Sequence, residues 1–325
     1  MISSDHATPT GPTVAFDEQR PAVQENDGDL LYGCLEAGGT KFLCSVGKPG
    51  QPWLERTSIA TEAPGPTMNA TLTFFKEAQA RHGPMASIGV ASFGPLQLDP
   101  GAPDWGALRR TPKKGWSGVS PAASLRSEFA IPVGLDTDVN AAAMAEAAEM
   151  ADGDRSTLVY ITIGTGIGGG AVIAGLPVHG FRHPEMGHIA PPRHPLDQDF
   201  PGVCPHHGGC IEGLASGPAI MARWGQKLSD LAADHPAHEI AAWYLAHLAV
   251  AVMSVLSPNR IVFGGGVMNA PGLLQRVRTH AARINAGYFA ESADLAEIIR
   301  GSVLGQEAGL IGALLLARRA AGQAC

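Results

Sequence analysis

Cysteine is scarce in this sequence, which has five cysteines in 325 residues: Cys34, Cys44, Cys204, Cys210 and Cys325. Such an odd and sparse set does not suggest the disulfide framework of a small secreted domain. The first 30 residues also lack the basic and apolar segments of a secretory signal. These absences favour the reducing cytoplasm, and we expect residues 1–29, rich in Pro, Asp, Glu, Thr and Gly, to form a disordered tail.

Long apolar runs and an excess of positive charge are missing as well. The longest apolar runs, near 248–256 and 310–317, are shorter than the roughly 20 residues that a membrane span needs. The formal net charge is −7, which argues against non-specific binding to nucleic acid or anionic lipid. We therefore predict neither a membrane nor a nucleic-acid partner.

What the sequence does contain is an alternation of strand and helix patterns. Strands are predicted at 30–35, 42–47, 87–93, 131–135, 158–163, 171–174, 260–263 and 297–303, and helices at 67–80, 139–150, 214–228, 238–256, 271–288 and 306–319. A strand, a glycine turn and a second strand occur twice, starting near Leu30 and Leu158. This internal repeat predicts an α/β protein with two related domains around a cleft.

We place the domain boundary just before Asp138. The first domain would cover 30–137, and the second 138–305, with a long loop at 188–210. The C-terminal helix, at 306–320, is a candidate to pack back on the first domain.

Three glycine clusters stand at strand ends: Gly38-Gly39-Thr40, Gly164-Thr165-Gly166 with its following glycines, and Gly264-Gly265-Gly266. Closely spaced backbone N–H groups in such turns bind anions. The sequence contains no P-loop, and the second cluster leads into a strand rather than into a helix as in a dinucleotide-binding motif. The clusters therefore predict hairpin-type nucleotide phosphate turns, although plain hairpin turns would give the same local pattern.

Asp138 follows the predicted strand at 131–135 and precedes a helix. Ligands gather at the carboxyl ends of strands in open α/β sheets, and kinases use an aspartate to accept a proton from the attacking hydroxyl. Capping of the helix by Asp136, Asp138 or Asn140 is the alternative interpretation.

The long second loop carries His188, Cys204, His207 and Cys210. Two thiolates and two imidazoles suit a tetrahedral structural zinc site, while incidental thiols and solvated histidines are the alternative. Glu185 and Glu212 flank this loop. Carboxylates accept hydrogen bonds from sugar hydroxyls, but Glu212 could instead stabilise a helix N-terminus.

In order along residues 31–318, the chain resembles the ROK family, and within it the bacterial fructokinase branch. The resemblance rests on seven motifs: Glu36-Ala-Gly-Gly-Thr-Lys-Phe, Ser92-Phe-Gly-Pro, Thr111-Pro-Lys, Thr137-Asp-Val-Asn-Ala-Ala-Ala, Ile163-Gly-Thr-Gly-Ile-Gly-Gly-Gly, His183-Pro-Glu-Met-Gly-His and Gly217-Pro.

The resemblance implies an actin-like (hexokinase and ribonuclease H-like) fold, and a kinase that uses ATP and Mg²⁺ to phosphorylate fructose. It implies Asp138 as catalytic base and a structural zinc ion. A homodimer is also implied. The implied ATP-binding residues are Gly38, Gly39, Thr40, Lys41, Gly164, Thr165, Gly166, Gly264, Gly265 and Gly266. The implied sugar-binding residues are Asn140, Glu185, His188, Glu212 and Lys113, and the implied zinc ligands are His188, Cys204, His207 and Cys210.

Several departures from the wider family point towards fructose. Glu36 stands where many ROK glucokinases have aspartate, and the extra methylene leaves a role in holding Mg²⁺ open. The zinc ligands Cys204 and His207 and the Thr111-Pro-Lys run match the fructokinase branch. Kinases for mannose, glucose or an N-acetylated amino sugar differ by a few contacts and stay open. A non-catalytic sugar sensor is the alternative from another class, while a repressor would need a basic DNA-binding domain.

Overall fold

The computed structural model describes residues 27–111, 113–150, 156–289 and 292–323. Of the expected tail, only Asp27–Asp29 falls within this range, as a short 3₁₀ helix. The rest of the tail and Pro112 of the Thr111-Pro-Lys run lie outside the described residues.

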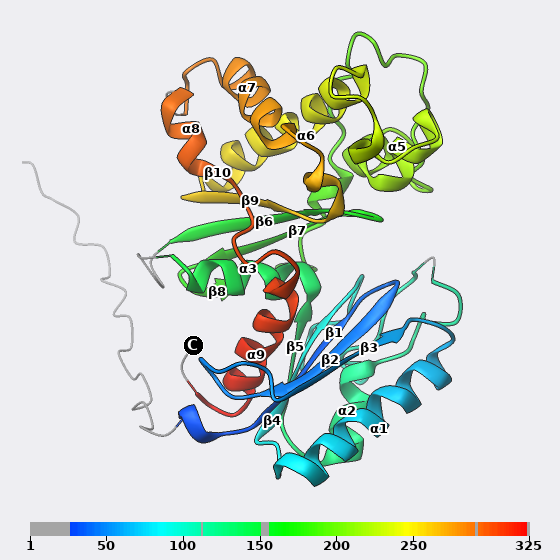
Figure 1. Ribbon diagram of the computed structural model, residues 1–325, viewed down its shortest axis with the longest axis vertical. Coiled ribbons are helices and arrows are strands. Elements are labelled where there is room, and N and C mark those ends of the chain that lie inside the picture. Colours follow the sequence, from blue (N-terminus) through cyan, green and yellow to red (C-terminus); the bar gives the residue numbers. More distant parts are fainter. Residues whose placement is uncertain (1–26, 112, 151–155, 290–291, 324–325) are drawn as a thin grey trace, which may run out of the picture.

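Two five-stranded mixed sheets form two lobes, each with helices on its faces (Figure 1). The first sheet has the order β3-β2-β1-β4-β5, with β1 Tyr32–Ala37, β2 Lys41–Gly47, β3 Glu55–Ala60, β4 Ser87–Ser92 and β5 Val133–Thr137. The second has the order β10-β9-β6-β7-β8, with β6 Thr157–Ile163, β7 Ile167–Ile173, β8 Leu176–Pro177, β9 Arg260–Gly264 and β10 Ile299–Gly301.

Both sheets are built in the same way around a central hairpin. Strand β1 pairs antiparallel with β2 and parallel with β4, and β6 pairs antiparallel with β7 and parallel with β9. The two glycine turns therefore join antiparallel strands, as the sequence predicted. The repeated layout and the two mixed sheets confirm the α/β, actin-like fold class.

The first lobe is covered by α1 Pro64–His82 and α2 Pro121–Phe129 on one face of its sheet (Figure 1). Helix α1 has a proline in its first turn and stops before Gly83, which has a φ of 98°. Ser120 caps α2, because its side chain accepts a hydrogen bond from the N–H of Ala123. Phe75, Leu125 and Trp116 are fully or almost fully buried between these helices and the sheet.

In the described part of the chain, five α-helices belong to the second lobe. They are α4 Ile211–Ala215, α5 Gly217–Trp224, α6 Pro236–Leu256, α7 Leu273–Asn285 and α8 Ser292–Ile298. Helix α6 is long and apolar enough to cross a membrane by length and composition. The sequence analysis, which counted only unbroken apolar runs, therefore missed this helix as a candidate span. However, 56% of the most apolar part of α6 is buried inside the lobe. Tyr244 and Leu248 of α6 are fully buried in the core.

Two helices, α3 Asp138–Ala148 and α9 Ala308–Ala320, lie between the two sheets (Figure 1). Helix α9 packs closely on the first sheet, because Gly89 and Gly134 offer no side chain in its way: a Cβ would lie 1.8 Å from the Ala313 oxygen and 2.2 Å from the Leu316 oxygen. Ser87 donates a hydrogen bond to the Ala317 carbonyl at 2.6 Å. The last helix thus completes the core of the first lobe.

The sequence missed β3 and α2 and misplaced some boundaries. Strand β3 alternates between half-buried and exposed residues at the sheet edge, so it lacks an apolar signal. The predicted strand at 297–303 is largely wrong at its start, because α8 runs to Ile298 and only Ile299–Gly301 form a strand. Gly168 to Gly170 belong to β7 and not to the turn.

Candidate active site

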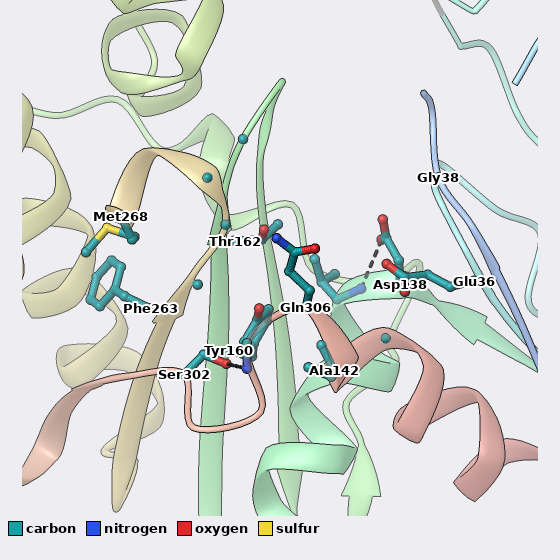
Figure 2. Close-up of a pocket in the computed structure, with 18 of the residues that line it drawn as sticks. Glu36, Gly38, Asp138, Ala142, Tyr160, Thr162, Phe263, Met268, Ser302 and Gln306 are labelled. Atoms are coloured by element: carbon teal, nitrogen blue, oxygen red, sulfur yellow. Dashed lines mark hydrogen bonds between the residues drawn. The ribbon is translucent and has the colours of Figure 1, made fainter. Parts of the chain in front are cut away.

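A cavity of about 610 Å³ opens between the lobes, beside α3 and the start of α9. It is lined by residues from five distant parts of the chain (Figure 2). Nearly all the predicted ATP-binding residues line it: Gly38, Gly39, Thr40, Lys41, Gly164, Thr165, Gly264, Gly265 and Gly266. Gly166 does not; a Cβ there would meet the Glu212 Oε2 at 2.7 Å.

The first two glycine turns are tight and are closed by their own backbone hydrogen bonds. The Gly38 N–H donates to the Lys41 carbonyl, and the Gly164 N–H donates to the Gly166 carbonyl, each at 2.9 Å. Gly265 has a φ of 88°, and a Cβ there would lie 2.4 Å from the Ile163 oxygen. Only glycine fits at 265, so the backbone of β9 can turn directly into the cavity.

Asp138 is the first residue of α3 and follows β5 directly. Thr137 is the helix cap, because its side chain accepts from the Asn140 N–H at 3.2 Å. The Asp138 Oδ1 accepts from the Val139 N–H at 2.9 Å (Figure 2). The capping role that competed for Asp138 thus belongs to its neighbour, and the Asp138 carboxylate lines the cavity.

Burial sets the protonation of Asp138. Loss of hydration raises the pKa of its carboxyl to about 6, and the negative charge of Glu185 adds to this rise. A carboxylate with such a pKa is ionised at neutral pH yet is a better proton acceptor than an exposed aspartate. This property suits a general base.

Glu36, at the end of β1, faces the same cavity as Asp138 (Figure 2). Burial raises the pKa of its carboxyl to about 7, with a further contribution from the charge of Asp138. Its Oε2 is buried and has no hydrogen-bond partner among the described residues. An orphaned buried oxygen beside a second carboxylate is a candidate ligand for a cation or for a water molecule bound to one.

The opposite end of the cavity was not predicted. Phe263 and Met268 form an apolar wall, and Tyr160, Ser302 and Gln306 line the floor (Figure 2). The Ser302 hydroxyl also contacts the buried carboxylate of Glu146 on α3. These residues come from separate strands and from the segment between β10 and α9, so no local sequence motif predicts them.

The predicted sugar-binding residues lie at several places. Glu185 is near enough to Asp138 to raise its pKa, and the Glu212 Oε2 accepts from the Ile167 N–H at 3.0 Å. The backbone N–H of Lys113 donates to the Thr111 hydroxyl oxygen at 3.3 Å; Lys113 is not in the cavity wall. Asn140 is fully buried, and its Nδ2 donates to the Asp136 Oδ1 at 2.8 Å.

His179 is a polar neighbour of Asn140 that the sequence did not single out. Its Nε2 lies 3.0 Å from the Asp136 Oδ2 and 3.3 Å from the Asn140 Nδ2. The hydrogen bond to Asp136 raises the pKa of His179. Since Asp136 lies on β5, the edge strand of the first sheet, and His179 follows β8 of the second, this cluster ties the two lobes together.

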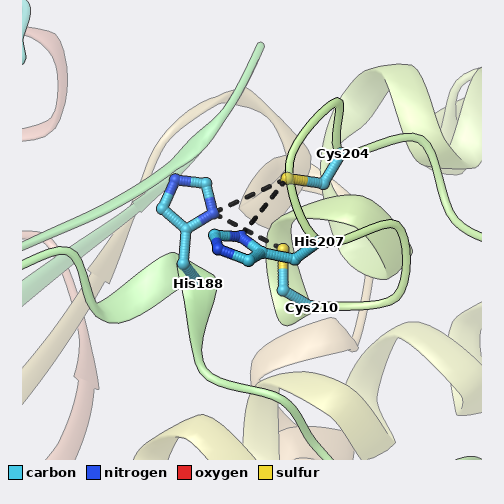
Figure 3. A group of neighbouring side chains, drawn as sticks. All are labelled: His188, Cys204, His207 and Cys210. Atoms are coloured by element: carbon cyan, nitrogen blue, oxygen red, sulfur yellow. Dashed lines mark hydrogen bonds between the residues drawn. The ribbon is translucent and has the colours of Figure 1, made fainter.

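His188, Cys204, His207 and Cys210 converge on one point (Figure 3). The Cys204 Sγ lies 3.7 Å from the Nδ1 atoms of His188 and His207, and the Cys210 Sγ lies 3.5 Å from the His188 Nδ1. A tetrahedral zinc ion, with Zn–S of about 2.3 Å and Zn–N of about 2.0 Å, holds sulfur and nitrogen ligands roughly 3.5 Å apart. The donor set and its spacing therefore fit such an ion.

This centre is joined to the candidate sugar-binding acid by the backbone. The His188 N–H donates to the Glu185 carbonyl at 3.0 Å across the 3₁₀ turn Met186–His188. Gly187 sits so close to β7 that a Cβ would lie 1.8 Å from the Ile167 oxygen. A metal ion at His188 would therefore also fix Glu185.

The site combines glycine turns, a buried carboxylate of raised pKa and the nearby acids Glu185 and Glu212. This combination suits phosphoryl transfer to an alcohol. The model of the ROK family matches residues 32–320. The chain is 47% identical over 290 residues to the fructokinase of Zymomonas mobilis, covering 88% of this chain and 96% of that protein. It is 37% identical over 293 residues to the fructokinase of Streptococcus mutans, covering 90% of this chain and 98% of that protein.

Among solved structures, the ROK hexokinase from Thermus thermophilus superposes with a TM-score of 0.70 at 28% identity, covering 89% of this chain and 98% of that one. The family match spans the residues that form both sheets and α9, and the similarity extends over nearly the whole length of each relative. The chain belongs to the ROK family.

Proposed function

We propose that this chain is an ATP-dependent fructokinase that forms fructose 6-phosphate. The observation that carries the proposal is the Asp138 carboxylate at the start of α3, in the wall of a cavity that three glycine turns also line. Fructokinases of 37% and 47% identity over most of the chain support fructose as the substrate.

In the proposed reaction, Asp138 accepts the proton of the 6-hydroxyl as that oxygen attacks the γ-phosphorus of ATP. A new O–P bond forms, and the bond from the γ-phosphorus to the β–γ bridging oxygen breaks, which leaves ADP. The turns at Gly38–Thr40 and Gly164–Gly166, with Lys41, hold the phosphates. Gly264–Gly266 and the apolar wall of Phe263 and Met268 receive the adenosine.

The sugar would lie on the other side of Asp138, between the lobes. Glu185 and Glu212 accept hydrogen bonds from its hydroxyl groups, and His188 borders this pocket. Asn140 acts from within the buried cluster with Asp136. Lys113 is the candidate contributed by the long loop of the first lobe.

Two metal ions complete the proposal. Mg²⁺ bound to the phosphates supplies charge neutralisation, and Glu36 offers its unpartnered Oε2 to that ion or to its hydration shell. Zinc held by His188, Cys204, His207 and Cys210 serves structure, because four protein ligands leave no open position. By resemblance to its family, the protein is proposed to be a cytoplasmic homodimer.

The direct test measures ADP release with fructose, mannose, glucose and N-acetylglucosamine at equal concentrations, together with the sugar phosphate formed. We expect the highest kcat/KM with fructose and fructose 6-phosphate as product. Higher kcat/KM with another hexose would overturn the substrate assignment. Absence of turnover with every sugar, in folded protein that contains its metal, would favour a non-catalytic sugar sensor.

A further inference from the structure

His183 occupies the point where loops of the two lobes meet beside the candidate sugar site. It is 8% exposed, and its Nε2 accepts a hydrogen bond from the Leu96 N–H at 3.2 Å. Leu96 belongs to the loop that follows β4 of the first lobe, while His183 follows β8 of the second. The missing side chain of Gly94 leaves room for the ring, since a Cβ there would lie 3.3 Å from the His183 Cε1.

The contact with Leu96 determines which ring nitrogen of His183 carries the proton. A neutral imidazole has one N–H and one acceptor nitrogen. Because Nε2 accepts from a backbone N–H, the proton of the neutral ring is on Nδ1. The Nδ1 atom lies 3.5 Å from the Glu185 Oε1, so the Nδ1–H group is the one that faces this carboxylate.

Glu185 needs such a partner. Its side chain is 47% exposed, and within the described residues His183 is the only basic side chain at ion-pair distance from its carboxylate. Glutamate has several rotatable bonds, so an exposed carboxylate without a donor samples many positions. The neighbouring charge of Asp138 also repels it. One fixed N–H donor would hold the Glu185 carboxylate in a single orientation.

We propose that His183 is a positioning residue for sugar binding, in which Nδ1–H orients the Glu185 carboxylate and Nε2 anchors the same ring to the 94–96 loop of the other lobe. This inference rests on the proposed function, in which Glu185 binds the sugar. The ring thereby couples the position of the 94–96 loop in the first lobe to the orientation of the Glu185 carboxylate in the second. A sugar hydroxyl then meets a carboxylate that is already oriented.

Two substitutions separate the two halves of this role. His183→Gln places an amide oxygen where Nε2 accepted from Leu96, but it has no donor at the Nδ1 position. His183→Asn places an amide N–H at the Nδ1 position, but it cannot reach the Leu96 N–H, which is left buried and unpaired. The two variants should therefore fail in different measurements.

We expect His183→Gln to raise the KM for fructose about 10-fold, the effect of losing a hydrogen bond to a charged group, with kcat changed less than about 3-fold and with an unchanged Tm. His183→Asn should raise the KM by less than His183→Gln does, because a donor remains at the Nδ1 position, and it should lower the Tm. Parallel changes of KM and Tm in both variants would mean a purely structural role and would overturn the proposal.

A double-mutant cycle tests the link to Glu185. The KM of His183→Gln combined with Glu185→Gln should equal that of Glu185→Gln alone, because the donor has then lost its acceptor. Additive effects would contradict the proposal.

A last measurement does not depend on the substrate assignment. Two-dimensional ¹H–¹⁵N spectra of the ¹⁵N-histidine-labelled protein, with His183→Gln to assign the signal, report the tautomer directly. We expect protonated Nδ1 and unprotonated Nε2. The opposite tautomer would overturn the inference even if fructose is phosphorylated. The expected tautomer in a protein that does not phosphorylate fructose would contradict only the proposed function.

Discussion

The carboxyl group of Glu36 packs directly against the backbone of Gly309 in the first turn of α9. A Cβ at position 309 would lie 2.3 Å from the Glu36 carboxyl carbon. Any larger residue at 309 would therefore displace the Glu36 side chain, which is one methylene longer than aspartate, from the cavity wall. The contact explains how a glutamate is accommodated at the end of β1.

Gly309→Ala should accordingly impair the protein even though alanine is the better helix former by about 1 kcal/mol. We expect a several-fold rise in the KM for ATP and a lower Tm, because the displaced Glu36 disturbs the cavity. Combining Gly309→Ala with Glu36→Asp should restore much of the loss, since the shorter acid leaves room for the methyl group. A double variant that is worse than Gly309→Ala alone would contradict this account.

Asp138→Asn should lower kcat by at least 10³-fold while fructose still binds with a Kd within a few fold of the unmodified protein. The amide has nearly the same shape but cannot accept the hydroxyl proton. Single-turnover kinetics and calorimetric titration with fructose measure the two effects. Substantial activity in the Asn variant would exclude Asp138 as the base.

The pH profile of kcat/KM should fall on the acid side with an apparent pKa near 6, because Asp138 must be ionised to act. The charge of Glu185 contributes to this raised pKa, so Glu185→Gln should move the acid limb to lower pH. Relative rates measured from pH 4.5 to 8 test both points. An acid limb that does not move in Glu185→Gln would argue against electrostatic contact between the two acids.

Stability should change with pH in the direction opposite to that of a salt-bridged acid. The pKa of Glu36 is raised from 4.5 to about 7 by burial, so the folded state binds its proton more tightly than the unfolded state. The associated stability is present below about pH 4.5 and is lost as pH rises through about 7. Glu36→Gln should regain on the order of 1–3 kcal/mol of unfolding free energy at pH 8, measured by urea denaturation. A loss of stability at pH 8 would contradict the prediction.

Cys204→Ser should abolish one equivalent of bound zinc and lower the Tm, because the loop around it has little apolar core. Cys44→Ala is the matched control, since Cys44 is also a buried thiol but lies in the first lobe away from the cluster. That variant should keep its metal. If elemental analysis finds no zinc in the purified, unmodified protein, the zinc hypothesis is wrong.

Local signals explain how much of this site the sequence could predict. Glycines in a hairpin turn, an aspartate at a strand–helix junction and the Cys204–Cys210 spacing are each readable within a few residues. The contacts that hold the segment between β10 and α9, whose Ser302 and Gln306 line the cavity, are not local. Trp53 donates from Nε1 to the Glu307 Oε2 at 3.1 Å, and Glu146 accepts hydrogen bonds from the backbone at 303–304.

The same limit applies to the residues that the sequence assigned without knowing their surroundings. Asn140 could be placed near Asp138 by number alone, but its burial against Asp136 and His179 depends on β5 of the first sheet and on the segment that follows β8 of the second. Gln306 fell inside a correctly predicted helical region, yet it precedes α9 and faces the cavity. Such features follow from tertiary packing and carry no sequence period.

The packing of α9 on the first sheet has a consequence for biosynthesis. Residues 32–137 leave the ribosome early, but the face of their sheet around Gly89 and Gly134 receives its covering helix only when residues 308–320 have been translated. Until then that face exposes apolar strands to the cell's chaperones and proteases. A premature stop codon just before Ala308 would therefore leave this face of the part made first without its covering helix.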